Sequence, residues 1–113
     1  MKYSEIDKYL LGFDGAWQDF PFGPEKSVYK VGVGEDAKLF ALADVDSRPL
    51  RISLRTDPML AKNLREKYDE VQPGDHLDRK RWITIINSGQ LSDEEIHDLA
   101  RLSHQLASDE VTL

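Results

Sequence analysis

The chain has 113 residues, a formal net charge of −6, 40% hydrophobic and 32% charged residues, and no cysteine. This length is typical of one domain, so we expect residues 1–113 to form a single domain around one hydrophobic core. The absence of cysteine excludes disulfides, thiolate metal sites and a cysteine nucleophile. No apolar run approaches the roughly 20 residues that span a bilayer, and the N-terminus does not resemble a signal peptide. We therefore predict a cytoplasmic protein that does not enter a membrane.

The first predicted element is a helix near the N-terminus. Ser4 is expected to cap this helix, and Ile6, Leu10 and Phe13 recur at the spacing of one helix face. Segment 20–24 is rich in proline and glycine and cannot continue a helix. We expect it to form a rigid connection to the first strand.

Three strands are predicted next, over residues 28–33, 38–45 and 50–56. In the last of these, Ile52 and Leu54 alternate with polar residues, as in a strand with one buried and one wet face. Because short turns join the three strands, we expect an antiparallel meander rather than a parallel βαβ sheet.

Two helices and one strand complete the prediction. Residues 57–58 (Asp-Pro) start a helix, residues 72–74 predict a turn, and the isoleucine-rich segment 82–87 predicts a strand. Ser92 and Glu95 form a capping box for the last helix. The predicted class is therefore α+β, an antiparallel sheet with helices packed on one face, in the order α-β-β-β-α-β-α.

The motifs in this order resemble those of the MmcQ/YjbR family. The segments that carry the resemblance are Pro21-Phe22-Gly23-Pro24 with Val28-Tyr29-Lys30-Val31, Phe40-Ala41-Leu42, the stretch 52–58, the stretch 73–77, and Trp82-Ile83-Thr84. The resemblance covers nearly the whole chain. It implies a frataxin-like (CyaY-like) fold and a DNA-binding role through a double-wing motif.

The best candidate site combines basic residues from two parts of the chain. Arg51 and Arg55 share one face of a predicted strand, and Arg79, Lys80 and Arg81 follow one another in a loop. If the loop approaches the strand, the guanidinium groups can hold phosphate or carboxylate with paired hydrogen bonds. We therefore predict a nucleic-acid-binding surface.

Four further residues extend this predicted surface. Lys30 lies on a neighbouring strand, Ser53 can donate a hydrogen bond to phosphate, and Trp82 and His76 flank the basic loop. Each has a structural alternative. The cations can form the wet face of a one-sided sheet and pair with acids, Trp82 can belong to the core, and His76 can hold its loop by hydrogen bonds.

Catalytic and metal-binding patterns are missing from the sequence, so we predict neither enzymatic activity nor a cofactor. The segment Gly32-Val33-Gly34 leads into a turn and a strand rather than into a helix N-terminus that could hold phosphate. His97 and His104 lie about 10 Å apart along a helix, too far for one metal ion. The partner predictions that remain open are DNA and a protein, bound by a monomer or weak homodimer. The net negative charge weakens attraction to a polyanion.

Overall fold

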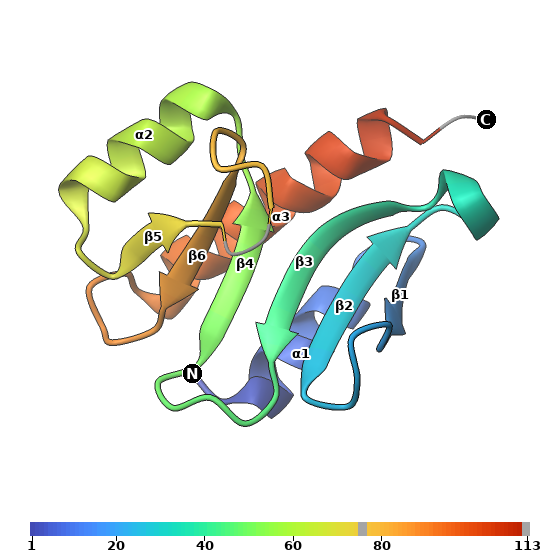
Figure 1. Ribbon diagram of the computed structural model, residues 1–113, viewed down its shortest axis with the longest axis horizontal. Helices are drawn as coiled ribbons and strands as arrows, with labels where there is room; N and C mark the ends of the chain where they lie inside the picture. Colours follow the sequence, from blue (N-terminus) through green and yellow to red (C-terminus); the bar gives the residue numbers. More distant parts are fainter. Residues whose placement is uncertain (75–76, 112–113) are drawn as a thin grey trace.

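The computed structural model describes residues 1–74 and 77–111, which form an α+β fold as predicted (Figure 1). The helices are α1 (Tyr3–Leu11), α2 (Pro58–Lys67) and α3 (Asp93–Asp109), and a short 3-10 helix covers Gly34–Asp36. The strands are β1 (Ala16–Asp19), β2 (Lys26–Val31), β3 (Lys38–Asp44), β4 (Arg51–Arg55), β5 (Val71–Pro73) and β6 (Trp82–Ile86).

The strands form one sheet in the order β1-β2-β3-β4-β6-β5, with each neighbouring pair antiparallel. The predicted element order is wrong in one respect, because it omitted β1 and β5 and assigned residues 72–74 to a turn. Both omitted strands are short and lie at the edges of the sheet. Each is defined by its pairing with one neighbour, which a local sequence pattern does not reveal. Pro73 is compatible with such an edge position, where a missing N–H donor costs little.

Local capping explains where α2 and α3 begin. The carboxylate of Asp57 accepts the backbone N–H of Leu60 at 2.9 Å, as the sequence predicted. The predicted capping box of α3 also forms, with reciprocal hydrogen bonds of 3.1 and 3.2 Å. The prediction for α1 was wrong, since Lys2 occupies the cap position without a side-chain bond and Ser4 lies inside the helix. Within the described chain, no helix combines the length and the apolar character needed to cross a bilayer.

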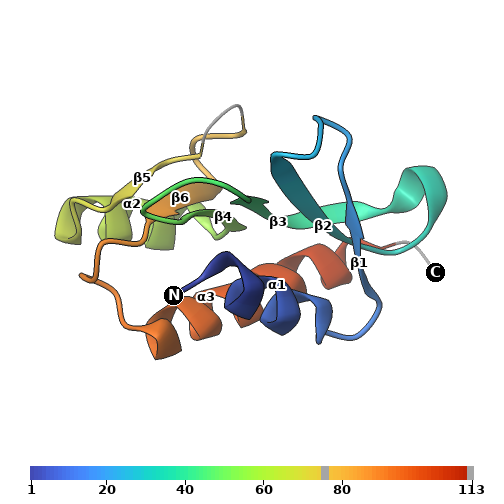
Figure 2. The same cartoon turned by 90° about the horizontal axis from the view of Figure 1, so that it is seen from below.

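The helices cover one face of the sheet and enclose the main core. Figure 2 shows α1 and α3 on the same side of the strands. The buried cluster joins residues of all three helices to the sheet; its members include Ile6, Leu10, Ala61, Ile96 and Ala100 from helices and Tyr29, Phe40, Ile52, Leu54, Ile83 and Ile85 from strands. The Ser103 hydroxyl donates to the Phe40 carbonyl and accepts the backbone N–H of Arg55, which fixes α3 across β3 and β4.

The two histidines of α3 hold that helix against the N-terminal segment. The ring of His97 stacks on Tyr9 with centroids 3.9 Å apart, and the ring of His104 stacks on Phe13 at 4.8 Å. The Nε2 atom of His104 also lies 2.8 Å from the carbonyl oxygen of Asp14. Both rings therefore have structural partners within the fold.

Candidate functional site

Five of the predicted site residues lie on the sheet face opposite the helices, which we call the open face. Leu42 pairs with Ser53 and Ser53 pairs with Thr84, and paired residues of antiparallel strands share a face. Alternation along β2, β4 and β6 adds Lys30, Arg51, Arg55 and Trp82 to the same face. Figure 2 shows the β1–β2 loop and the segment that follows residue 76 before β6 on this side of the sheet.

Most cations of the predicted surface form ion pairs with carboxylates. The pairs are Lys30–Asp19 (3.3 Å), Arg51–Asp44 (3.5 Å), Arg81–Asp78 (2.9 Å) and Arg55–Glu110, the last through two hydrogen bonds. This arrangement corresponds to the structural alternative raised from the sequence. It leaves these four side chains with little uncompensated positive charge.

In two of these ion pairs the carboxyl group has a lowered pKa. Hydrogen bonds from Arg55 lower the pKa of the Glu110 carboxyl below its usual value. The pKa of the Asp78 carboxyl is also lowered, first by the hydrogen bond from the backbone N–H of Lys80 and then by the guanidinium of Arg81. Both acids therefore stay ionised over a wider pH range, and they keep neutralising their basic neighbours.

Ser53 and Trp82 are buried rather than presented to solvent. Each is only 8% exposed, and the Ser53 hydroxyl is hydrogen-bonded to Thr84 at 2.9 Å. Trp82 packs with Val28 and Leu42 in a small second cluster. Its ring serves the packing of the open face, whereas stacking on a nucleic-acid base requires an accessible ring.

One arginine from the strand and one from the loop do come together. Arg51 and Arg79 line a shallow hollow of about 620 Å³ beside β5. Arg79 and Lys80 are exposed, and neither side chain has an ion pair within the described residues. Arg55 lies at the other end of β4, next to Glu110. The predicted contribution of His76 falls outside the described residues.

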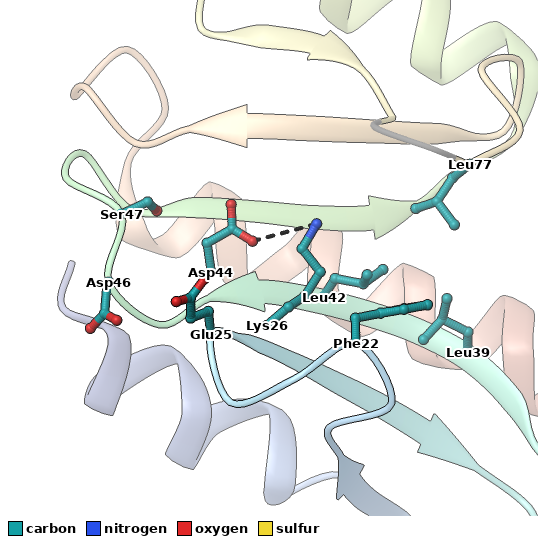
Figure 3. Close-up of a pocket in the computed structure, with 9 residues that line it drawn as sticks. All are labelled: Phe22, Glu25, Lys26, Leu39, Leu42, Asp44, Asp46, Ser47 and Leu77. Carbon is teal, nitrogen blue, oxygen red and sulfur yellow. Dashed lines mark ion pairs between the residues drawn. The ribbon is translucent and has the colours of Figure 1, made fainter.

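A larger hollow crosses the open face between the two loops, and we call it the open-face groove (Figure 3). Its volume is about 740 Å³. The lining residues are the apolar Phe22, Leu39, Leu42 and Leu77 and the polar Glu25, Lys26, Asp44, Asp46 and Ser47. Phe22 is 71% exposed, so a large aromatic side chain stands at the wall of the groove without being covered by the fold.

The two ends of the groove differ in chemistry. In Figure 3 the three carboxylates lie toward one end, and Phe22, Leu39 and Leu77 lie toward the other. Asp44 is engaged by Lys26 at 3.7 Å and by Arg51 at 3.5 Å. The other two acids, Glu25 and Asp46, are exposed and carry no ion pair within residues 1–74 and 77–111. Neither in the groove nor elsewhere in those ranges do three metal-ligating side chains gather closely enough to hold a metal ion.

Sequence reasoning missed this groove, for which the sequence held one signal and the strand pairing supplied the other. Pro21 and Pro24, at the two ends of the 21–24 segment, restrict the backbone of the connection that displays Phe22. Side chains along β3 do not strictly alternate between the two faces of the sheet, because the pairing of β3 with β2 shifts its register between Tyr29 and Lys30. Leu39 and Leu42 therefore both reach the groove although they are three positions apart.

Comparison with known sequences shows similarity over most of the chain. The sequence model of the YjbR family matches residues 11–106. Uncharacterized protein YjbR of Escherichia coli K12 is 34% identical over 107 residues, which cover 95% of this chain and 87% of that protein. Uncharacterized protein YbdF of Escherichia coli O157:H7 is 31% identical over 90 residues, or 80% of this chain and 70% of that protein.

Solved structures share the fold. The crystal structure of protein DR2400 from Deinococcus radiodurans, described by the family-model domain DUF419, superposes with a TM-score of 0.92 at 29% identity. It covers 99% of this chain and 82% of its own. A crystal structure from Pseudomonas syringae gives a TM-score of 0.78 at 27% identity, over 95% of this chain and 99% of its own.

Proposed function

This chain belongs to the YjbR family, and from that premise we propose that it is a protein-interaction module whose open-face groove binds a partner protein. The observation that carries the proposal is the groove of about 740 Å³, with Phe22 71% exposed, on the sheet face opposite the helices. Exposed apolar surface rimmed by polar residues is typical of interaction sites, and aromatic side chains are enriched in them.

The charge distribution supports a protein partner over a polyanion. The net charge is −6, and Lys26 in the groove and Arg51 on the neighbouring strand both pair with Asp44. Long-range attraction to phosphates is correspondingly weak. An apolar contact flanked by carboxylates favours a partner that supplies apolar side chains.

The proposed role is binding without catalysis. Ser47 supplies a hydroxyl group to the groove, and the oxygen of this hydroxyl accepts a hydrogen bond from the backbone N–H of Arg51 at 3.0 Å. No histidine is among the described residues that line the groove, so the groove does not show the serine–histidine pairing of a serine nucleophile.

Site-specific photo-crosslinking in cells tests this proposal. A photoreactive residue replaces Phe22 in the groove, and the matched control replaces Lys62, which is exposed on α2. We expect a discrete protein adduct from position 22 that is absent from position 62. The adduct should disappear when Leu39→Ser is added. Crosslinking of equal intensity at both positions, or none at position 22, would contradict the proposal.

DNA binding is a second candidate, and one specific observation favours it. Arg51 and Arg79 line the same shallow hollow, and Lys80 is exposed beside them. This basic edge could contact a phosphate backbone without the buried Trp82 or Ser53. Such binding would be driven by counterion release and would weaken steeply with salt.

Fluorescence polarisation with a short DNA duplex and its single strand at low salt tests this second candidate. Arg79→Glu combined with Lys80→Glu should weaken binding and flatten its salt dependence, since fewer counterions are released. The control is Lys62→Glu on α2, which changes charge away from the hollow. If neither DNA binds to the unmodified protein at low salt, DNA binding is ruled out.

A further inference from the structure

We propose that the segment held in the open-face groove is a short peptide with a large apolar side chain at one end and an arginine or lysine at the other. The apolar side chain lies between Phe22, Leu39 and Leu77, and the cation lies between Glu25 and Asp46. This inference rests on the proposed function and adds the chemical class of the partner.

The apolar end of the groove offers a seat for one large side chain. Phe22 comes from the β1–β2 loop, Leu39 from β3 and Leu77 from the β5–β6 loop, so three separate segments converge there (Figure 3). Leu39 and Leu77 pack against the buried cluster around Trp82 and remain half-buried. A side chain placed over them removes apolar surface of both molecules from water.

The opposite end is chemically selective because its carboxylates are unequal. Asp44 already has two cationic partners, Lys26 and Arg51. Glu25 and Asp46 have none within the described residues. A guanidinium or ammonium group therefore finds two available acceptors, and an arginine can bond a carboxylate with two parallel hydrogen bonds.

The length of the groove indicates a peptide rather than a single amino acid. Leu39 and Asp44 are five positions apart on β3, a distance of about 17 Å along a strand. An extended peptide rises by a similar amount per residue, so its apolar and basic residues should be about four to six positions apart. A ligand of one residue would reach only one end.

Two other occupants are disfavoured by charge. A second copy of this chain carries the same net charge of −6. A nucleic acid would bring phosphates toward Glu25 and Asp46. Phosphates would meet carboxylates at the acidic end, and two chains of like net charge repel one another at long range, so both occupants are disfavoured.

Selection from a displayed random-peptide library on the intact protein tests the inference. The most enriched peptides are synthesised with a fluorophore, and their affinities are measured by polarisation. Three variants are compared with the unmodified protein: Glu25→Lys with Asp46→Lys, Phe22→Ser with Leu39→Ser, and the control Glu66→Lys with Glu94→Lys. The control makes the same charge change on exposed helix positions. Far-ultraviolet circular dichroism and urea unfolding establish that each variant is folded.

We expect enriched peptides that combine an aromatic residue or leucine with arginine or lysine. Their affinity should fall at least about tenfold in the Glu25 and Asp46 double variant but little in the control, and it should weaken with salt. Peptides that require Phe22 and Leu39 yet bind the charge-reversed variant unchanged would overturn the inference and leave the proposed function standing. Peptide binding unaffected by every groove variant, or no enrichment at all, would overturn both.

Discussion

The two faces of the sheet use the same strands for different purposes. In β6, Ile83 and Ile85 are fully buried beneath the helices, whereas Ile86 on the open face is only half-buried. The helix-covered face joins residues of α1, α2 and α3 into one core, while the open face holds a small cluster around Trp82 and a groove. In β6 side-chain type alone does not separate the two faces, because isoleucine lies on both; the helices that cover one face do. The face that folding leaves uncovered is the one available to a partner.

The sharpest test of this contrast compares two isoleucines of one strand. Ile83→Ala removes a fully buried side chain under the helices and should lower the free energy of unfolding by about 2–5 kcal/mol. Ile86→Ala makes the same chemical change on the open face, and it should cost clearly less because part of that side chain already meets water. Urea unfolding followed by circular dichroism measures both. Equal losses would show that the open face is as tightly packed as the core.

A buried hydroxyl on the helix-covered face gives the next largest expected effect. Tyr29 is fully buried, and its hydroxyl donates to the Asp7 carboxylate at 2.6 Å. Tyr29→Phe removes this hydrogen bond and should lower the free energy of unfolding near neutral pH by about 1.5–3 kcal/mol, the range for bonds to charged groups. Urea titration at neutral pH measures the loss. An unchanged urea midpoint would mean that this hydrogen bond contributes nothing to the stability of the fold.

The same residue predicts a pH dependence. Burial, followed by the hydrogen bond to Asp7, raises the pKa of Tyr29 far above its usual value. The unfolded chain loses the phenolic proton near pH 10 while the folded chain keeps it, so this contribution is complete below about pH 10 and is lost as pH rises further. Unfolding measured on both sides of that pH should show a steeper alkaline loss for the unmodified protein than for Tyr29→Phe. Parallel pH profiles would refute this assignment.

Packing beneath the β5–β6 loop should matter somewhat less. A Cβ atom added at Gly74 would lie 2.5 Å from the Cβ atom of Trp82, so the chain must shift to accept it. Gly74→Ala should therefore cost about 1–3 kcal/mol, as overpacking does. Fluorescence of Trp82 during urea unfolding reports the change, with Trp17→Phe as the background to isolate the signal. An unchanged unfolding midpoint would show that the chain at Gly74 can shift to accept the added methyl group without loss of stability.

The smallest effect is expected at the ion pair between β4 and the end of α3. Because Arg55 lowers the pKa of the Glu110 carboxyl, the pair stabilises the fold above the usual pKa of a glutamate and loses this contribution as pH falls through the lowered value. Glu110 is exposed, so solvent screening should limit the cost of Glu110→Gln to about 1 kcal/mol or less. Thermal unfolding at neutral and acidic pH should show that the melting temperatures of the unmodified protein and Glu110→Gln converge in acid. A difference that persists there would point to another cause.

The sequence by itself determined the α+β class and the elements whose signals are local. The Asp57 cap, the capping box at Ser92 and the core-facing side chains of Ile52 and Leu54 formed as predicted, because each depends on residues within one turn or one strand. The family resemblance, carried by motifs spread over the chain, is confirmed by the match over residues 11–106.

Tertiary structure alone decided the two edge strands and the character of the open face. A count of basic residues predicted a cationic surface, but strand register placed Asp44 beside both Lys26 and Arg51. The groove joins Phe22 to Leu77, which the chain separates by more than 50 residues. Ion pairs and grooves of this kind arise from which strands and loops meet, and no periodicity or capping rule carries that information along the chain.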